Sequence, residues 1–399
     1  MTTPTEKRFE VHIESSLVAQ GYTSLPYTKY DRGLCLIPDE VTGFIKSTQP
    51  KEWEKLELQY GDSAPSKVLG RISDEIGKRG IVDVLRNGVK DRGANLRLVY
   101  FQPNSGLNKE HEDLYRLNRL SLVRQLRYSS KNENSIDMVL FVNGLPVLTM
   151  ELKNQLTGQS YKDSEKQYKT ARDPAEPLLR FKRCAVHFCV DNDNVSMTTK
   201  LAGDKTRFLP YNKDIENPVN YDGYRTYYLW EEVLAPGSLC DILENFVHLS
   251  TESSTEWDST KGKVVDRTKE VLVFPRYHQL TVIRRLKDAI REEGVGHNYL
   301  IQHTTGSGKS YSIGWLAHLL TSLYKTKHDT KRMFDSIIVV TDRIVLDKQL
   351  QRTVKQLEQT HGVVNKVEAG SKQLKQYLES GKDIIVTTIQ KFPSISEEM

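Results

Sequence analysis

The chain contains little cysteine, and its cysteines are widely spaced. The four are Cys35, Cys184, Cys189 and Cys240, and they form no C-x-x-C pair. Disulfide frameworks and zinc sites need paired or clustered cysteines. The sequence therefore suggests neither, and a reducing, cytoplasmic location is expected.

Long apolar runs are also lacking. No hydrophobic stretch approaches the roughly 20 residues that span a bilayer, and the N-terminus lacks the apolar core of a secretory signal. We therefore expect no membrane association. The net charge of +5 is small for 399 residues, so charge alone does not imply a polyanionic partner.

The length of 399 residues predicts two or three domains, because one domain usually has roughly 100 to 200 residues. Residues 250–262 are rich in Ser, Thr and Glu and poor in apolar residues, which is typical of a linker. We expect a first domain over 1–249, a linker over 250–269 and a second domain over 270–399.

The first domain shows both helical and strand periodicity. Phe9, Ile13 and Leu17 recur at every fourth position before Gly21, which predicts an opening amphipathic helix. A strand is expected over 118–128, although Leu114 and Leu117 would also suit a helix. The remaining elements expected here are a β-hairpin of 136–142 and 145–152, a polar helix over 159–173 and a buried strand over 185–191.

Beyond the linker, helical and strand patterns alternate. The expected helices cover 276–293, 311–325 and 346–357, and the expected strands cover 298–303, 336–341 and 383–388. Such alternation is typical of βαβ units around a parallel sheet. The expected fold class is therefore α/β.

Two carboxylates and a lysine interrupt the apolar hairpin. Asp137 lies in its first run, and Glu151 and Lys153 lie at the end of its second. Carboxylates that hold Mg²⁺ can activate water for phosphodiester hydrolysis, and a lysine beside them can orient the water or the phosphate. The alternative is an Asp–Lys ion pair that ties two strands together.

The register of this hairpin tests the metal hypothesis. Residues opposite one another in an antiparallel pair point to the same face. A regular two-residue loop at Asn143-Gly144 leaves Asp137 one position out of register with Glu151. A shared metal therefore predicts either a three-residue loop over 143–145 or a β-bulge, each of which brings the two carboxylates opposite one another.

A glycine-rich segment, His303-Thr-Thr-Gly-Ser-Gly-Lys-Ser310, lies between an expected strand and an expected helix. In a P-loop, backbone N–H groups surround phosphate, the lysine reaches the β and γ phosphates, and the final Ser ligates Mg²⁺. His303 stands where the strict pattern has glycine, and a chance match is the alternative. The candidate nucleotide-binding residues here are Thr305, Gly306, Ser307, Gly308, Lys309 and Ser310.

Residues 118–125, 136–146 and 150–154 together resemble the restriction subunit of type I restriction-modification enzymes. The resemblance implies a restriction-endonuclease-like domain of the PD-(D/E)xK class. It assigns Asp137 and Glu151 as Mg²⁺ ligands and Lys153 as the catalytic lysine. Ile136 replaces the proline that usually precedes the aspartate.

A second element of that family, Gln-x-x-x-Tyr, is imperfect in this chain. Ser164 stands four residues before Tyr168, where the family has glutamine. Gln167 is the candidate substitute. Later segments at 197–201 and 208–212 also resemble a branch of the family, so the resemblance covers nearly the whole chain.

The region around the glycine-rich segment resembles superfamily 2 helicases. Arg276-Tyr-His-Gln279 is similar to their adenine-reading motif, and residues 340–346 and 387–392 are similar to their DNA-tracking motifs. The resemblance implies an incomplete RecA-like lobe that binds ATP through Gln279 and the P-loop. No acidic Walker B strand follows, so we expect part of a longer subunit that cannot by itself turn over ATP.

The expected function is Mg²⁺-dependent cleavage of unmethylated duplex DNA, coupled in the full-length protein to ATP-dependent translocation, in defence against phage. The resemblance implies assembly with methyltransferase and specificity subunits. One alternative is a nuclease–helicase of repair or phage defence without a methyltransferase partner. The other is a truncated chain that binds DNA without cleaving it.

Overall fold

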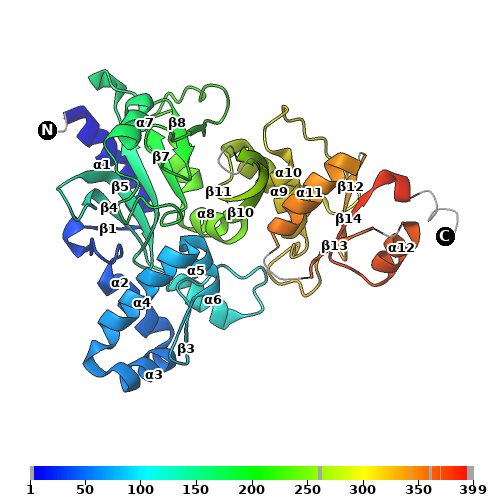
Figure 1. Cartoon of the computed structure of the whole chain (residues 1–399), viewed down its shortest axis with the longest axis horizontal. Coiled ribbons are helices and arrows are strands. Elements are labelled where there is room, and N and C mark those ends of the chain that lie inside the picture. Colours follow the sequence, from blue (N-terminus) through cyan, green and yellow to red (C-terminus); the bar gives the residue numbers. More distant parts are fainter. Residues whose placement is uncertain (1–3, 259–262, 343, 359–361, 369, 393–399) are drawn as a thin grey trace. The chain divides into compact units, whose positions relative to one another are not determined.

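The computed structural model describes residues 4–258, 263–342, 344–358, 362–368 and 370–392. The chain divides into two compact units (Figure 1). Unit 1 comprises residues 1–102 and 110–274, and unit 2 comprises residues 103–109 and 275–399. Both units mix helices and strands, which confirms the expected α/β class. No described helix is both long and apolar enough to cross a membrane.

Unit 1 is built on a seven-stranded mixed sheet with the order β1-β4-β5-β6-β7-β8-β9. β1 runs parallel to β4 and β6 parallel to β7, whereas the other neighbours are antiparallel. The strands are β1 Thr23–Leu25, β4 Leu120–Arg127, β5 Ser135–Val142, β6 Leu145–Leu152, β7 Val186–Val190, β8 Val195–Thr198 and β9 Leu209–Pro210.

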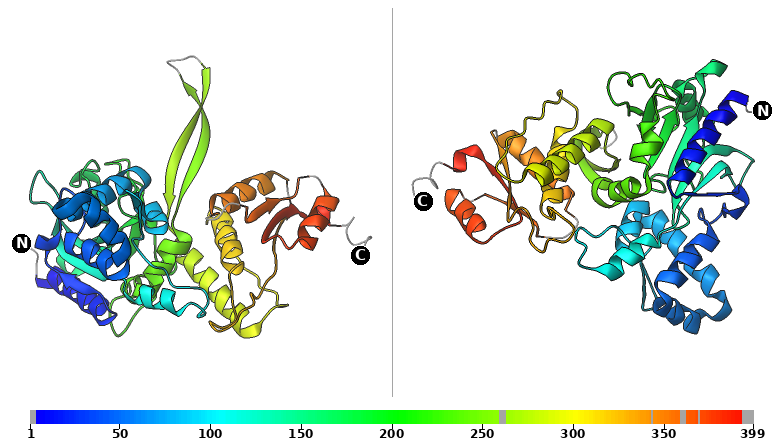
Figure 2. Two further views of the ribbon diagram at one scale, coloured as in Figure 1. Left: turned by 90° about the horizontal axis from the view of Figure 1, so that it is seen from below. Right: turned by 180° about the vertical axis from the view of Figure 1, so that it is seen from behind.

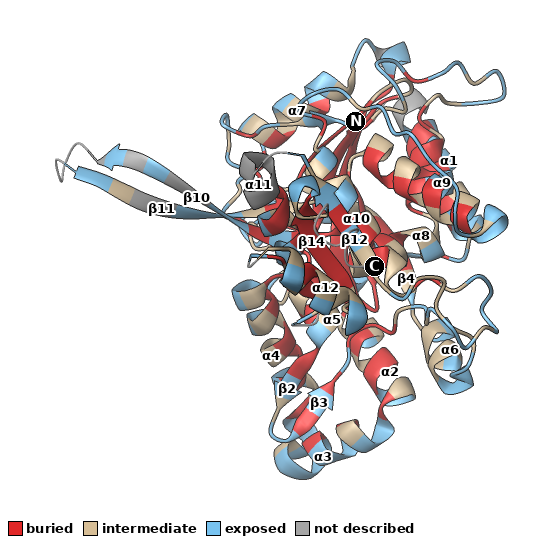
Figure 3. Cartoon of the chain, turned by 90° about the vertical axis from the view of Figure 1, so that its right-hand side faces the viewer, coloured by how far each residue is buried: buried red, intermediate tan, exposed pale blue. Residues whose placement is uncertain are grey.

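The core of unit 1 lies at the centre of this sheet. Figure 3 shows that buried residues gather on strands and exposed residues on the outer helices. All eight residues of β6 are buried, as are seven of the eight in β5. A strand buried on both faces has to be apolar at nearly every position, which explains why these two runs are almost uninterrupted in the sequence. The expected hairpin is confirmed, and so are the strands expected at 118–128 and 185–191.

Unit 1 also contains several helices. They are α1 Pro4–Ala19, α2 Pro38–Thr48, α3 Pro50–Tyr60, α4 Ala64–Arg79, α5 Ile81–Asn87, α6 Lys109–Arg116, α7 Tyr161–Thr170 and α8 Pro236–Asp241, with π-helical turns at Leu229–Val233 and Ile242–Phe246. Phe9, Ile13 and Leu17 of α1 are completely buried, so the predicted opening helix is confirmed. The polar helix predicted at 159–173 is α7, whose first turn is closed by a Ser160–Asp163 capping box.

The helices α2 to α5 were not anticipated from the sequence. The start of α2 packs on the β5–β6 loop, where the N–H of Ile37 donates to the Gly144 carbonyl at 2.8 Å. Gly144 has φ +80°, and a Cβ there would lie 2.6 Å from the Ile37 carbonyl oxygen. Only glycine fits this close approach. The Asn143-Gly144 turn therefore joins β5 to β6 and also binds the start of α2.

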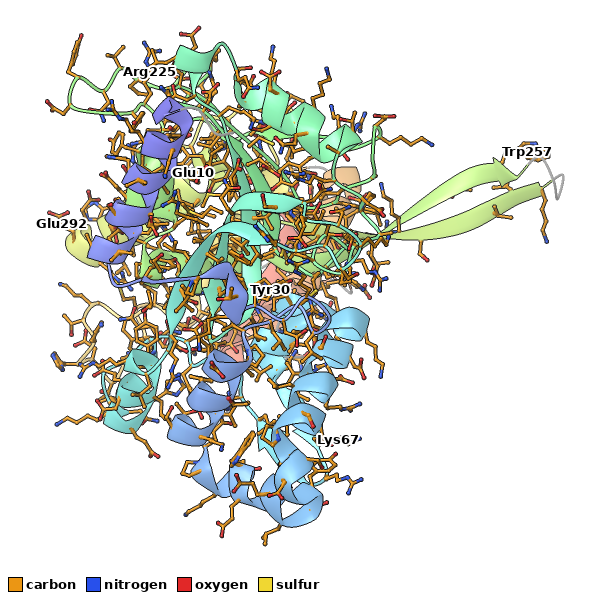
Figure 4. All side chains as sticks on the ribbon, turned by 90° about the vertical axis from the view of Figure 1, so that its left-hand side faces the viewer. Glu10, Tyr30, Lys67, Arg225, Trp257 and Glu292 are labelled. Carbon is orange, nitrogen blue, oxygen red and sulfur yellow. The ribbon has the colours of Figure 1, made fainter. Side chains whose placement is uncertain are left out.

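Residues 250–258 and 263–269 do not have the irregular structure expected of a linker. β10 His248–Asp258 and β11 Lys263–Val273 pair along their whole length as an antiparallel hairpin, while residues 259–262 lie outside the described residues. The hairpin extends away from the rest of unit 1 (Figure 2), and Trp257 lies near its far end (Figure 4). β10 is polar, so its extended state depends on pairing with the valine-rich β11, which its own composition does not reveal. A small second hairpin joins β2 Val89–Asp91 to β3 Ala94–Leu96.

Unit 2 contains a three-stranded parallel sheet with the order β12-β14-β13, so the expected parallel pairing is confirmed. Its elements are α9 Tyr277–Glu293, α10 Lys309–Leu320, β12 Ile337–Thr341, α11 Ile344–Gln356, β13 Val364–Lys366, α12 Ser371–Glu379 and β14 Ile384–Thr388.

The strand expected at 298–303 is wrong. Residues 297–304 have no regular secondary structure, and the side chain of Leu300 is 94% exposed. A strand needs a neighbour to satisfy its backbone groups, and among the described residues no strand pairs with this segment. Its apolar composition resembled a buried strand, but the burial that would give such a strand its stability is missing here.

Candidate active site

A β-bulge sets the geometry of the β5–β6 hairpin. The loop itself has two residues, Asn143 and Gly144, and it pairs Val142 with Leu145. Further from the loop Leu140 pairs with Leu148 and Met138 with Met150, so β6 holds one extra residue. The same register carried one position further places Asp137 opposite Glu151. The bulge predicted for a shared site is thus confirmed, and the alternative three-residue loop is not the one used.

Glu151 is a completely buried carboxylate. Its Oε1 accepts a hydrogen bond of 2.7 Å from Nε of Arg172, which is itself 8% exposed. Its Oε2 is buried and has no hydrogen-bond partner among the described residues. Burial, and then the neighbouring charge of Asp137, raise the pKa of Glu151 well above its ordinary value, while Arg172 opposes that rise.

Asp137 is held at both of its oxygens. Its Oδ2 accepts the backbone N–H of Leu152 at 2.7 Å, which ties it to the strand of Glu151. Its Oδ1 accepts a bond of 3.1 Å from Nε2 of Gln125. Gln125 lies within β4 with φ +48°, a left-handed conformation that costs a non-glycine residue about 1 kcal/mol. Such an outlier within a strand next to a charged site suggests a functional constraint.

The same amide of Gln125 also donates to Oε1 of Glu10, at 2.9 Å. Glu10 belongs to α1 and is only 1% exposed (Figure 4). Its Oε2 accepts a hydrogen bond of 3.2 Å from Nη2 of Arg124. Burial and then the charge of Asp137 raise the pKa of Glu10 to about 7, although Arg124 and Gln125 lower it. Glu10 is therefore a third carboxylate joined to the pair by one shared amide.

Lys153 follows β6 directly and is 9% exposed. Its backbone N–H donates to the Val190 carbonyl at 2.8 Å and so continues the pairing with β7. Residues two apart on an extended chain share a face, which puts Lys153 on the side of Glu151. A buried cation is thus held within the same small region as the carboxylates.

Helix α7 closes this region through the imperfect Gln-x-x-x-Tyr element. Ser164 is buried and its hydroxyl donates to the Glu151 carbonyl at 3.3 Å. Tyr168 is also buried, and its hydroxyl lies 2.7 Å from Oγ1 of Thr149, which is itself 2.7 Å from Nδ1 of His187. Ser164 therefore contacts the main chain of Glu151, and the role suggested for Gln167 stays a prediction. Tyr168 serves as a core residue in this arrangement.

The carboxylate pair fits a hard divalent cation. Among the described residues no group of three or more His, Cys, Asp or Glu side chains is arranged to hold a metal ion. Mg²⁺, however, is commonly bound through one or two carboxylates and keeps several waters. The buried, unpartnered Oε2 of Glu151 supplies an acceptor that such a cation would satisfy. Asp137 and Glu151 are the residues that could hold it.

In unit 2 the predicted P-loop is a turn that leads into α10. Gly306 and Gly308 have φ of +78° and +83°, values that glycine adopts readily. The ammonium of Lys309 donates to the carbonyls of His303 and Thr304, at 3.0 and 2.9 Å. Lys309 is exposed, as are Thr305 and Gly306, while Ser307 is buried and Gly308 and Ser310 are half-buried.

The predicted adenine-reading residue, Gln279, contacts this loop. Its Nε2 donates to the Ser307 and Gly308 carbonyls at 3.2 and 3.1 Å, and its Oε1 accepts the Arg276 N–H at 2.8 Å. The structure thus brings Gln279 and the P-loop together, with every polar atom of the amide group engaged. Residues 340–346 are one of the two segments that resemble DNA-tracking motifs. Within this segment, Arg343 lies outside the described residues.

Sequence reasoning did not assign Glu10, Gln125 or Arg172 to the site. Each lies far from the Glu-x-Lys triplet in the chain and reaches it only through the fold. The one available signal was Glu10 on the predicted opening helix, where a carboxylate beside Phe9 sits next to the apolar face. Nothing local distinguishes Gln125 or Arg172 from other polar residues.

Comparison with known proteins identifies two segments. Residues 10–206 match the family model of the type I restriction enzyme R protein N terminus, and residues 278–399 match that of the SWI2/SNF2 ATPase. The first match contains Asp137, Glu151 and Lys153, and the second contains Gln279 and the P-loop.

Curated relatives agree with these matches. The chain is 28% identical over 70% of its length to a type I restriction enzyme HindI endonuclease subunit of Haemophilus influenzae. It is 21% identical over 85% to a putative type I restriction enzyme MjaVIIIP endonuclease subunit of Methanocaldococcus jannaschii. It is 24% identical over 83% to a type I restriction enzyme SsaAORF53P endonuclease subunit of Staphylococcus saprophyticus.

These matches cover 26%, 31% and 32% of the respective relatives, so the chain spans less than a third of their length. The family models and the relatives nevertheless point to a single kind of protein. Residues 10–206 correspond to the N-terminal part of the restriction (R) subunit of type I restriction-modification enzymes, and the chain as a whole is similar to these subunits.

Proposed function

We propose that unit 1 is a Mg²⁺-dependent endonuclease that cuts unmethylated duplex DNA, with Asp137, Glu151 and Lys153 as its catalytic residues. The observation that carries the proposal is the β-bulge, because it places two buried carboxylates opposite one another. Hydrogen bonds also fix both carboxylates in place, since Asp137 is engaged by Gln125 and Leu152 and Glu151 by Arg172. We assign the nuclease domain to residues 1–249, with a restriction-endonuclease-like fold.

The bound cation would neutralise charge on the scissile phosphate and lower the pKa of a water molecule. Asp137 and Glu151 would hold it, and their fixed hydrogen bonds mean that little reorganisation is needed on binding. Lys153 would orient the attacking water or stabilise the negative charge that develops on the phosphate. Burial of all three residues strengthens these electrostatic interactions by excluding bulk water.

Unit 2 would bind ATP and Mg²⁺ at the P-loop. Lys309 would exchange its bonds to two local carbonyls for the β and γ phosphates, Ser310 would contact Mg²⁺, and Gln279 would read adenine. We propose that residues 270–399 belong to a RecA-like motor lobe whose translocation licenses cleavage in the full-length subunit. The partners would be duplex DNA and the methyltransferase and specificity subunits, in defence against phage.

A plasmid cleavage assay tests the nuclease proposal. The chain would be incubated with Mg²⁺ and unmethylated plasmid, with and without ATP and the methyltransferase and specificity subunits. We expect nicking or linearisation by the wild type and its loss in Lys153→Ala. Lys166→Ala, at an exposed position of α7, is the matched control and should cut normally. Equal cutting by Lys153→Ala, or no Mg²⁺-dependent cutting under any of these conditions, would contradict the proposal.

A further inference from the structure

Arg172 lies next to the proposed nuclease site but outside its motif. It lies two residues after the end of α7, and its side chain is 8% exposed. Nε donates to Oε1 of Glu151 and Nη2 to the backbone carbonyl of Ser135, each at 2.7 Å. Ser135 is the first residue of β5 and Glu151 lies near the end of β6. One guanidinium therefore connects the two strands that carry Asp137 and Glu151.

The segment that presents Arg172 is itself held by hydrogen bonds. The N–H of Ala171 donates to the Gln167 carbonyl at 2.9 Å, which closes the end of α7. Oδ1 of Asp173 accepts the N–H of Ala175 at 2.8 Å, and Oδ2 of Asp173 receives Lys131 at 3.2 Å. These bonds fix the backbone on both sides of Arg172. The guanidinium of Arg172 therefore extends from a backbone segment whose conformation is held by hydrogen bonds.

The two carboxylate oxygens of Glu151 differ in their hydrogen bonding. Oε1 is engaged by Arg172, and the main-chain carbonyl of Glu151 is engaged by Ser164 of the same helix. Oε2 has no hydrogen-bond partner among the described residues, although it is buried. A buried carboxylate oxygen without a donor is costly unless something else satisfies it. The arrangement leaves one defined oxygen available for a cation.

We propose that Arg172 is a positioning residue that fixes Oε1 of Glu151 and so presents Oε2 to the divalent cation. This inference rests on the proposed nuclease function. Arginine suits the task because its planar guanidinium directs several N–H groups in fixed directions, whereas the ammonium of lysine is a single flexible point. Residues that orient metal ligands in this way typically contribute 10 to about 100-fold to metal affinity.

Binding of Mn²⁺ to the full chain tests this role without depending on cleavage. Free and bound Mn²⁺ would be measured by electron paramagnetic resonance for wild type, Arg172→Gln, Arg172→Lys and Asp137→Asn, which identifies binding at this site. Arg180→Gln is the matched control, because Arg180 is exposed and its Nε donates to the nearby Ala175 carbonyl. Circular dichroism would establish which variants are folded.

We expect Arg172→Gln to weaken Asp137-dependent Mn²⁺ binding by about 10 to 100-fold, Arg172→Lys to be intermediate, and Arg180→Gln to match the wild type. In cleavage assays the KM for Mn²⁺ should rise more than kcat falls, which a purely structural defect would not produce. If Arg172→Gln does not fold, the Mn²⁺ affinity of Arg172→Lys decides the test, because this variant keeps the positive charge and loses the two-point contact.

Wild-type affinity in a folded Arg172→Gln and in Arg172→Lys would overturn the inference, as would tighter binding, which would mean that Arg172 competes with the cation. Failure of the nuclease proposal gives a different result. In that case the wild-type chain itself would show no Mn²⁺ binding that Asp137→Asn removes.

Discussion

The two candidate sites of this chain are stabilised in different ways. In unit 1 Asp137, Glu151 and Lys153 are 8%, 0% and 9% exposed, and side chains from β4 and from the end of α7 hold the carboxylates. In unit 2 Lys309 is exposed, and its ammonium donates to the carbonyls of His303 and Thr304, within six residues along the chain. The first site depends on tertiary contacts, whereas the second is a local loop at a helix N-terminus.

This difference predicts how each site responds to substitution. A buried charge whose partner is removed is left without compensation, which is strongly destabilising. An exposed lysine that contacts only nearby carbonyls contributes little to folding, since surface substitutions usually change stability by less than about 0.5 kcal/mol. Changes around the first site should therefore alter folding and function together, whereas changes in the P-loop should separate them.

The largest expected effect is at Tyr168. Tyr168→Ala removes a fully buried ring from the helix that covers the site, and we expect unfolding free energy to fall by about 3 to 5 kcal/mol. Urea unfolding monitored by circular dichroism would measure it. Tyr221→Ala is the control, because Tyr221 is 94% exposed. A stable Tyr168→Ala protein that has lost only DNA binding would show that Tyr168 is a contact residue instead.

Glu10 gives the next effect, with a sign set by its pKa of about 7. The folded state binds a proton that the unfolded state loses near pH 4.5, so this contribution to stability is present below pH 4.5 and is lost as pH rises through 7. Glu10→Gln should therefore stabilise the metal-free chain by about 1 to 3 kcal/mol at pH 8 and change little at pH 4. A variant less stable than wild type at pH 8 would contradict this.

His187 should make unit 1 sensitive to acid. Burial lowers its pKa from 6.5 to about 4, so between these values the unfolded state binds a proton that the folded state does not. Stability is present above pH 6.5 and falls toward pH 4, by at most about 1.4 kcal/mol per pH unit. His187→Gln should lose this part of the slope, whereas His12→Gln, at an exposed position, should keep it. Identical slopes in wild type and His187→Gln would refute the assignment.

The smallest effect on folding is expected at Lys309. Lys309→Ala should change unfolding free energy by less than about 0.5 kcal/mol and still remove measurable ATP binding, because no other P-loop side chain supplies that charge. Fluorescence titration with an ATP analogue beside thermal unfolding would test both parts. Loss of folding in this variant would break the contrast between the two sites, and unchanged nucleotide binding would refute the P-loop assignment.

Local patterns were the predictable part of this molecule. The period of Phe9, Ile13 and Leu17 identified α1, and the runs around Asn143-Gly144 identified the central hairpin. The bulge was predictable only as a condition for a shared site, because nothing in the two apolar runs marks Val147 as the extra residue of β6. The strand predicted at 298–303 is absent for a related reason, because this exposed segment lacks the neighbouring strand with which it would pair.

Long-range partners were the part that sequence could not supply. Glu10, Gln125 and Arg172 lie between 12 and 127 residues from the carboxylates that they adjoin, counted from their numbers in the chain. Each is an ordinary polar residue until the fold brings it to Asp137 or Glu151. The β10–β11 hairpin is similar, since the polar β10 is extended only because β11 pairs with it.

The most direct test of the central claim is to locate a divalent cation in crystals of the chain grown with Mn²⁺, using its anomalous scattering. The account predicts a peak between the carboxylates of Asp137 and Glu151 that disappears in Asp137→Asn. Mn²⁺ bound elsewhere in unit 1 with these two carboxylates still held only by their protein partners would contradict it.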